Sequence, residues 1–198
     1  MTLEREKAEG KRQKGKGRSY KAERAQKLTP DTATPQGWAA AIALRPIGPD
    51  DRSFLLAVYA STRELELAAV EWDAAQKTAF VQMQFDAQHA YYQEHYAGAA
   101  FDIILVNGQP AGRLYVAHEE DEIRIVDIAL LPEHCNGGVG TTLLRGLQSE
   151  AAAAGKPLRI HVERFNPALR LYERLGFTSI ADRGVYLFME WRARLPSA

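Results

Sequence analysis

Cysteine is almost absent from the chain, because Cys135 carries the only thiol among 198 residues. One cysteine cannot close an intramolecular disulfide, and it cannot supply the paired cysteines of structural zinc sites. The chain also lacks an apolar run of about 18 residues, the length needed to span a bilayer, and its basic N-terminus lacks the apolar stretch of a secretory signal. These absences predict a cytoplasmic protein with no metal site and no membrane partner.

Aliphatic side chains are scarce in the first 36 residues, where positive charge is concentrated. This segment has 10 Lys and Arg against 5 Asp and Glu, whereas residues 37–198 have 15 against 20. So little apolar surface cannot offset the entropy of ordering a chain, and we expect residues 1–38 to form a basic, disordered tail and linker. The tail can bind RNA or an anionic surface weakly, or it can be a solubilising extension or the product of an upstream start codon. Residues 39–194 are expected to form one folded domain, with no other nucleic-acid contact.

The first half of this domain has the pattern of one strand followed by two helices. Residues 42–47 alternate as a strand does, and Pro49 opens a segment with apolar residues at helical spacing. Asp73, followed three residues later by Gln76, predicts a capping box at the start of the second helix. One face of that helix is predicted to be core, and it comprises Phe80, Met83, Gln84, Ala87 and Tyr91.

The second half has alternating apolar segments separated by polar turns, with two helical segments among them. Its first three strands predict an antiparallel meander with a turn at Asn107-Gly108. The expected segments are strands at 101–108, 110–121 and 122–131, a helix at 139–154, a strand at 158–163, a helix at 168–175, and strands at 177–182 and 185–191. The predicted class is α/β, with a mixed, mostly antiparallel central sheet flanked by about four helices. The predicted order is strand, two helices, three strands, helix, strand, helix and two strands.

Three glycines lie where a predicted strand gives way to the helix at 139–154. Gly137, Gly138 and Gly140 would let an anion approach the unpaired amides and the positive dipole end of that helix. A tight strand-to-helix connection would also use such glycines. No lysine follows Gly140, as a P-loop requires, and Leu143 stands where the dinucleotide-binding fingerprint needs glycine. The junction therefore disfavours both the P-loop and the dinucleotide-binding classes.

The segment Cys135–Gly140 resembles, except at its first position, the Gln/Arg-x-x-Gly-x-Gly/Ala signature of the GNAT superfamily of N-acetyltransferases. Asp127–Glu133 is similar to the family's coenzyme-binding strand. Asn166–Ala168, Tyr172 and Leu175–Phe177 match the family's N-x-A, Y and LGF positions. The order of elements extends this resemblance over the whole folded domain. The resemblance implies a GNAT-like fold and transfer of an acetyl group from acetyl-CoA to an amine.

Most of the coenzyme contacts that this resemblance implies use the backbone. Ile128, Ala129 and Leu130 would hydrogen-bond the pantetheine arm like an added strand, and the glycine loop would hold the pyrophosphate. The loop residues implied are Cys135, Asn136, Gly137, Gly138, Val139, Gly140 and Thr141. Cys135 replaces the family's usual Gln or Arg and is interpreted as a small buried residue. Asn166 is predicted to be a helix N-cap and also to contact the coenzyme.

Tyr172 is the catalytic acid that the resemblance implies. In direct transfer, the amine attacks the thioester carbonyl, a backbone N–H near Leu130 polarises the oxyanion, and the Tyr172 phenol protonates the departing sulfur as the tetrahedral intermediate collapses. Helical spacing alone would also fit an ordinary core aromatic at this position. The position of Tyr172 in the family pattern favours the catalytic role.

The general base is not set by the resemblance. Many family members carry a glutamate at positions that correspond here to Val126 or Arg124, neither of which can accept the proton. The available side chains are Asp127, His161 and Glu163, and we rank Glu163 first. A water relay to bulk solvent is an equal alternative, since the acceptor amine needs only a modest shift to lose its proton.

The acceptor is expected to contact the segment between the first two helices and the last hairpin. Conspicuous residues there are Glu64, Glu66, Glu71, Trp72 and Tyr186. Acidic residues favour a cationic amine, although a solvated helix end gives the same pattern, so polyamine, amino acid, aminoglycoside and protein N-terminus all stay open. The alternative to an enzyme is a catalytically silent CoA-binding sensor or partner-docking module. In either case we expect a monomer or a homodimer.

Overall fold

A computed structural model of the chain describes residues 41–193, which divide into two units. The helical unit comprises residues 49–98, and the sheet unit comprises residues 41–48 and 99–193. The predicted tail at 1–38 lies outside the described residues. The predicted domain bounds of 39 and 194 also lie outside them, and both stay predictions.

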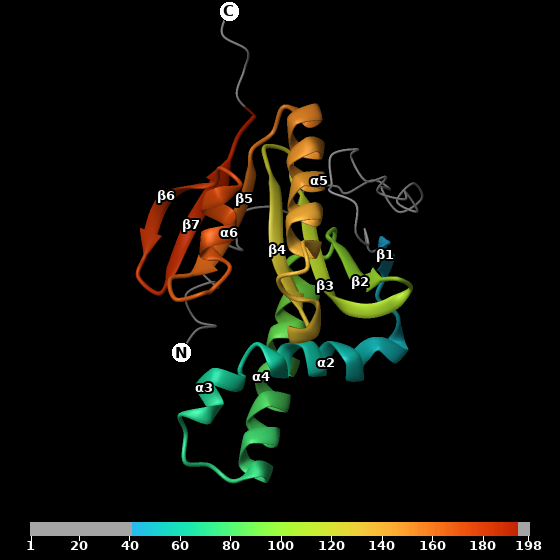
Figure 1. Cartoon of the computed structure of the whole chain (residues 1–198), viewed down its shortest axis with the longest axis vertical. Coiled ribbons are helices and arrows are strands. Elements are labelled where there is room, and N and C mark those ends of the chain that lie inside the picture. Colours follow the sequence, from blue (N-terminus) through green and yellow to red (C-terminus); the bar gives the residue numbers. More distant parts are fainter. Residues whose placement is uncertain (1–40, 194–198) are drawn as a thin grey trace, which may run out of the picture. The chain divides into compact units, whose positions relative to one another are not determined.

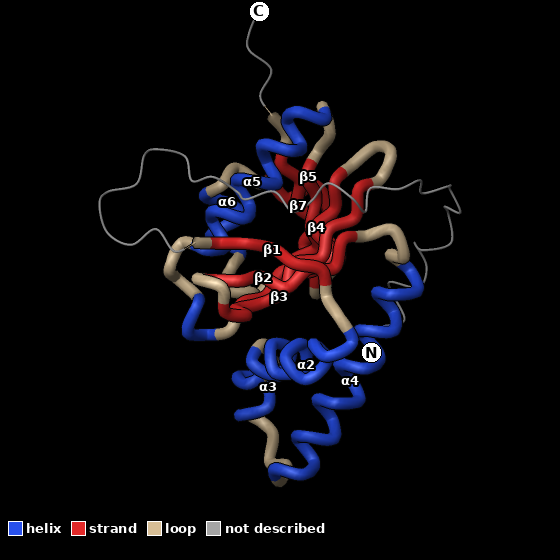
Figure 2. Tube along the Cα trace, turned by 90° about the vertical axis from the view of Figure 1, so that its right-hand side faces the viewer, coloured by secondary structure: helices blue, strands red, loops and turns tan. Residues whose placement is uncertain are grey.

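The helical unit contains α2 (Arg52–Ser61), α3 (Glu64–Ala68) and α4 (Ala74–His95), preceded by the short 3₁₀ turn η1 (Pro49–Asp51). Helices α2 and α4 pack against each other (Figures 1 and 2). The capping box predicted at the start of α4 is confirmed, because the Gln76 amide donates to Asp73 Oδ1 at 2.8 Å and the Asp73 amide donates to Gln76 Oε1 at 3.0 Å. These two bonds satisfy amides that the helix itself leaves unpaired.

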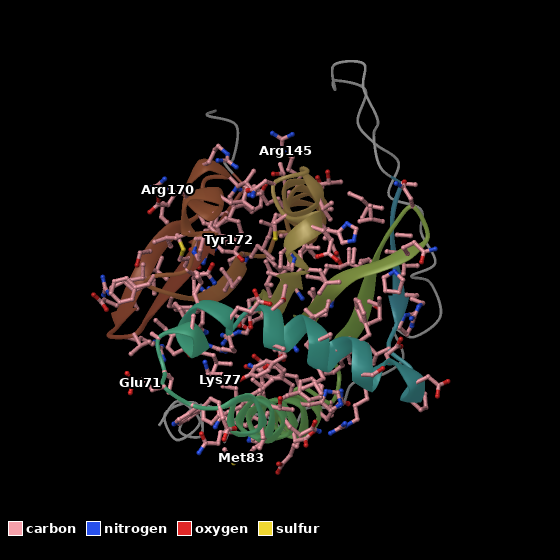
Figure 3. The ribbon with its side chains drawn as sticks, turned by 60° about the horizontal axis from the view of Figure 1, so that its bottom comes forward. Glu71, Lys77, Met83, Arg145, Arg170 and Tyr172 are labelled. Atoms are coloured by element: carbon pink, nitrogen blue, oxygen red, sulfur yellow. The ribbon has the colours of Figure 1, made fainter. Side chains whose placement is uncertain are left out.

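The core face predicted for α4 is correct only in part, because Tyr91 is buried as predicted but Met83 is not. Met83 is 57% exposed and projects outward (Figure 3), whereas Val81 and Phe85 are buried. A step of one residue turns a helix by about 100°, and α4 carries small and polar residues around most of its circumference. Packing against α2, and not the sequence pattern, therefore selects the buried face. The four expected helices correspond to α2, α4, α5 and α6, and the short helix α3, between the first two of them, was not predicted.

The sheet unit contains seven strands in one sheet, ordered β1-β2-β3-β4-β5-β7-β6. The strands are β1 (Ile42–Pro46), β2 (Ala100–Val106), β3 (Gln109–His118), β4 (Ile123–Leu130), β5 (Leu158–Glu163), β6 (Thr178–Arg183) and β7 (Tyr186–Trp191). Neighbours pair antiparallel except β4 and β5, which are parallel. The predicted mixed, mostly antiparallel α/β fold is confirmed.

Two helices, α5 (Val139–Ala154) and α6 (Leu169–Arg174), cover one face of this sheet (Figure 1). Helix α5 contributes Leu143, Leu144 and Leu147 to the buried core, and α6 contributes Tyr172. Inward-facing side chains of β2, β3, β4, β5 and β7 complete that core. Burial of each leucine contributes roughly 1.5–3 kcal/mol, so this layer fixes α5 and α6 on the sheet.

Strands β4 and β5 separate after a short stretch of pairing. Their register covers only Ile123–Ile125 of β4 and Leu158–Ile160 of β5. In the next step along β4, Val126 is an extra residue, because Val116 of β3 pairs with Ile125 while Tyr115 pairs with Asp127. A bulge of this kind bends its strand. Beyond it, β4 stays with β3 and β5 stays with β7, so the sheet opens between β4 and β5.

Gly112 of β3 allows the far end of β4 to lie close to β3. A Cβ at this position would be 2.2 Å from the carbonyl oxygen of Ala129 and 2.9 Å from a side-chain carbon of Leu130. The first of these contacts is with backbone and cannot be relieved by rotating a side chain. Only glycine fits this contact.

We therefore expect Gly112→Ala to destabilise the protein by about 3 kcal/mol or more, because β4 must move away from β3 to admit the methyl group. Gly98→Ala is the matched control, since a Cβ there meets nothing within 4 Å and no positive φ is required. Urea unfolding of the three proteins measures the difference. Equal unfolding midpoints for Gly112→Ala and the wild type would contradict the close contact.

Candidate functional site

The loop between β4 and α5 places a helix N-terminus beside the open part of the sheet. After the 3₁₀ turn η2 (Pro132–His134), Asn136 has φ 61° and Gly138 has φ 85°, so the chain turns sharply into α5. The Thr142 amide donates to the Gly138 carbonyl at 3.0 Å, which is the first bond of the helix ladder. The amides of Val139, Gly140 and Thr141 precede that bond and are the unpaired donors typical of a helix start.

Space around this loop suits an anion. The stretch from Cys135 to Gly138 is exposed, and a Cβ at Gly138 would meet nothing within 4 Å. Glycine is therefore needed at position 138 because the backbone is left-handed there, and not because a neighbour leaves no room for a side chain. At Gly140, a Cβ would lie 3.4 Å from Leu171 of α6, so the helix start packs against α6 on its inner side. Open amides on the outer side and the positive dipole end fit a phosphate group.

The free edge of β4 fits an extended ligand. The Leu131 amide donates to the Ala111 carbonyl at 2.9 Å, and the Ala129 carbonyl lies against Gly112, so both residues direct backbone groups toward β3. Alternation along an antiparallel pair then turns the N–H and C=O of Ile128 and Leu130 toward the opening beside β5. Three residues of this strand were predicted to contact the coenzyme, and the register favours Ile128 and Leu130 over Ala129.

Cys135 is exposed, and its interpretation as a small buried residue is wrong. Its thiol points to backbone oxygens, with Sγ 3.5 Å from the Leu131 carbonyl and 3.9 Å from the Leu130 carbonyl. Partial burial, followed by the negative charge of Glu133, raises the pKa of the Cys135 thiol. A protonated thiol that donates to carbonyls at the end of β4 is consistent with a role in bracing the loop.

Tyr172 lies on the inner face of α6. It is only 4% exposed, and its ring packs edge-on against Phe177 at 5.6 Å between centroids. Figure 3 shows Tyr172 between its helix and the sheet, whereas Arg170 of the same helix projects outward. Burial, and then the charge of Asp127, raises the pKa of Tyr172 well above its ordinary value. The phenol is therefore protonated at neutral pH and can donate a proton but cannot serve as a base.

Asp127 is paired with Arg113 across β3 and β4. The guanidinium Nη2 and the carboxylate Oδ2 are 2.8 Å apart, and the two side chains are 4% and 13% exposed. Breaking a buried pair leaves an uncompensated charge, so this contact holds β4 at its bulge. It also occupies the Asp127 carboxylate and disfavours Asp127 as the general base. This pair was not predicted, although each residue is a charge with apolar neighbours on both sides of it or close to it in the strand.

Glu163 is the last residue of β5. Leu158, Ile160 and Val162 face the core under α5 and α6, so alternation places Glu163 on the opposite face of the sheet. There the Tyr186 hydroxyl donates to Glu163 Oε1 at 3.3 Å. The candidate acid and the candidate base thus come from opposite faces of the sheet unit.

The remaining candidate base, His161, is engaged in a contact on this second face, and a group of paired charges lies near it. His161 stacks on Phe188 with 4.4 Å between ring centroids. Arg124 binds the Glu122 carboxylate, which also binds Arg159 at 2.7 Å. Glu122 is only 4% exposed, so this group of charges ties β4 to β5 at the end where the two strands pair.

Asn166 is not the N-cap residue of the helix, as was predicted, because the helix begins later in the chain. Helix α6 begins at Leu169, with Ala168 as its N-cap residue. The Asn166 Oδ1 accepts a hydrogen bond from the Ala168 amide at 2.9 Å, and the Leu169 amide donates to the Asn166 carbonyl at 3.0 Å. Asn166 therefore fixes a tight turn before the helix, because Pro167 and Ala168 form that turn instead of the first helical turn.

The residues predicted to contact the acceptor lie in different units. Glu64 and Glu66 belong to α3, where Glu66 accepts from Arg63 at 2.8 Å, while Trp72 packs edge-on against Phe80 at 5.1 Å. Glu71 precedes Trp72 in the same helical unit, whereas Tyr186 begins β7 of the sheet unit.

Within residues 41–193, no helix is long and apolar enough to cross a membrane. The same residues contain no cluster of three or more His, Cys, Asp or Glu side chains able to hold a metal ion.

The raised pKa of Tyr172 predicts a loss of stability in alkaline solution. An unfolded tyrosine ionises near pH 10, and the folded phenol ionises at higher pH, so its stabilising contribution is complete below about pH 10 and is lost as pH rises further. While only the unfolded form is ionised, the loss is about 1.4 kcal/mol per pH unit. Urea titrations between pH 9 and 11 should show this loss for the wild type and a shallower one for Tyr172→Phe. Parallel curves for the two proteins would contradict the burial of an un-ionised phenol.

Comparisons with known proteins agree with this geometry. The model of the acetyltransferase (GNAT) family matches residues 64–177, which is more than half of the chain. The PaiA N-acetyltransferase of Thermoplasma acidophilum, determined in complex with coenzyme A, is 16% identical, with a TM-score of 0.60 over 77% of this chain and 99% of that one. An acetyltransferase of Thermus thermophilus is 18% identical, with a TM-score of 0.56 over 77% and 97%.

A third similar structure, the ribosomal-protein-S18-alanine N-acetyltransferase of Escherichia coli, is 20% identical, with a TM-score of 0.50 over 79% of this chain and 96% of that one. At these identities, the similarities show a shared fold. A comparison with curated protein sequences finds no match. The family model covers the opened strand, the glycine loop and Tyr172, and on that match the chain belongs to the GNAT acetyltransferase family.

Proposed function

We propose that this protein transfers an acetyl group from acetyl-CoA to a primary amine by direct attack of the amine on the thioester. The opening between β4 and β5 is the observation that carries this proposal, because it leads from a free strand edge to the unpaired amides of α5. The similarity in fold to a protein determined with coenzyme A supports the same ligand here.

The backbone of this chain supplies most of the proposed coenzyme contacts. Ile128 and Leu130 would hydrogen-bond the pantetheine arm along the edge of β4, as an added strand would. The amides of Val139, Gly140 and Thr141 would bind the pyrophosphate at the start of α5. The pantetheine arm and the pyrophosphate would thus each use one of the two sets of backbone groups that point into the opening.

Tyr172 and Glu163 would move the protons. Tyr172 holds a proton at neutral pH and would pass it to the sulfur as the carbon–sulfur bond breaks. A backbone N–H at the β4 edge would stabilise the oxyanion of the tetrahedral intermediate, and Glu163 would accept the proton that the attacking amine loses. Glu163 lies on the face opposite α6, so the amine would approach the thioester from the side away from Tyr172.

Release of free thiol from acetyl-CoA across a panel of amines tests this function. We expect turnover with at least one amine, and Tyr172→Phe should lower kcat by about 10²–10³-fold because the sulfur then leaves without a proton donor. The phenylalanine keeps the ring in the core, so coenzyme A affinity should be unchanged. Tyr96→Phe, which removes a phenol at the end of α4, is the matched control and should keep full activity.

Two outcomes would contradict the proposal in different ways. Coenzyme binding without turnover on any amine would favour a catalytically silent sensor. No measurable coenzyme binding would defeat both functions. Calorimetric titration with coenzyme A, carried out on the same preparations, separates the two outcomes.

Glu163→Gln tests the proposed base. At pH 7 we expect kcat/KM to fall about 10²-fold, since the acceptor is then mostly an ammonium ion that must lose a proton. The loss should shrink as the pH approaches the pKa of the amine, because free amine no longer needs the carboxylate. Tyr186→Phe, which removes only the hydrogen bond to Glu163, should have a smaller effect. A pH profile identical to that of the wild type would show that water takes the proton instead.

A further inference from the structure

Gln148 is a polar residue on the buried face of α5. It is 9% exposed, and Leu144 and Ala151, which lie one turn before and after it, belong to the hydrophobic core. Burial of a carboxamide is unfavourable unless its polar atoms are hydrogen-bonded. The Gln148 Nε2 donates to the Leu175 carbonyl, the C-cap of α6, at 2.8 Å. An apolar side chain would suit this position better, so the glutamine marks a place where the hydrogen bond matters.

The backbone of Leu175 is bonded directly to Tyr172. The Leu175 amide donates to the Tyr172 carbonyl at 3.1 Å, and the Phe177 amide donates to the same carbonyl at 3.0 Å. The Phe177 ring also packs edge-on against the Tyr172 ring. The turn that Gln148 holds is therefore the one that carries the phenol.

Helix α6 depends on tertiary contacts for its position. It has only six residues, and a helix of that length is not stable alone. Helix α5 contacts it a second time nearer its start, because a Cβ at Gly140 would lie 3.4 Å from Leu171 Cδ2. Within residues 41–193, the contacts that hold Tyr172 are made by its ring and its backbone. The position of the phenol therefore follows the position of α6 on α5.

We propose that Gln148 is a positioning residue for Tyr172, and that its bond to Leu175 places the phenol where it meets the sulfur of the coenzyme. This inference rests on the proposed acetyl transfer. The start of α5 would bind the pyrophosphate, and the same helix holds α6 through Gln148. One rigid helix would thus set the distance between the bound coenzyme and the proton donor, and small errors in such distances are costly for catalysis.

A double-mutant cycle of Gln148 and Tyr172 tests the inference. Gln148→Met removes the N–H donor and keeps the length of the side chain in the core. We expect kcat for thiol release to fall about 10-fold, because the phenol is no longer held at the sulfur. In the Tyr172→Phe background no phenol is left to position, so the same change should lower kcat less than about 2-fold. Calorimetric titration should give the wild-type affinity for coenzyme A in every variant.

Ser149→Ala is the matched control. Ser149 is the next residue of α5, and its hydroxyl donates to the Arg145 carbonyl of the same helix at 3.0 Å. The change removes a side-chain donor without affecting α6 and should keep full kcat in both backgrounds. Gln148→Asn retains the carboxamide but is one carbon shorter, so it should lower kcat only where Tyr172 is present. It carries the test if Gln148→Met does not fold.

The failures of the inference and of the proposed function are distinguishable. An equal fold-loss of kcat with and without Tyr172 would show that Gln148 only stabilises the fold, which would overturn the inference and leave acetyl transfer standing. A wild-type kcat in Gln148→Met would also overturn it. Coenzyme binding with no thiol release by the wild type on any amine would overturn both.

Discussion

Strands β4 and β5 run parallel for three residue pairs and then separate, and the proposed site depends on that separation. The paired end is tied by Glu122, which binds Arg124 of β4 and Arg159 of β5. Immediately beyond it, the extra residue Val126 bends β4, and β4 remains on β3 through a register that includes the buried Arg113–Asp127 pair. The sheet is therefore closed at one end and open at the other, with each strand still held by its outer neighbour.

The opening gives the two faces of the sheet different chemistry. On one face, α5 directs unpaired amides toward the end of β4, and α6 holds a buried phenol whose pKa is raised by burial. On the other face, β5 and β7 present Glu163 with Tyr186. Coenzyme and acceptor would then approach the same gap from opposite faces. This arrangement separates the donor of a proton to sulfur from the acceptor of a proton from the amine.

Local rules of the backbone account for what could be predicted from the sequence. The capping box at Asp73 and the turn at Asn107-Gly108, with φ of 53° and 81°, depend on a few neighbouring residues, and both are present. The confirmed fold follows from the order of such segments. Long-range packing accounts for the errors, since the exposure of Met83 and of Cys135 depends on what each residue faces after folding. The close contact at Gly112 and the partner of Asp127 depend on strand register, which one sequence does not set.

Amide hydrogen exchange with and without coenzyme A tests the role of the opening most directly. If the coenzyme binds along the β4 edge and at the start of α5, the amides of Ile128 and Leu130 and those of Val139, Gly140 and Thr141 should become protected. Ala129, whose carbonyl already lies against β3, should change little and serves as an internal control. Unchanged exchange at Ile128, Leu130 and the start of α5 under saturating coenzyme A would contradict the account.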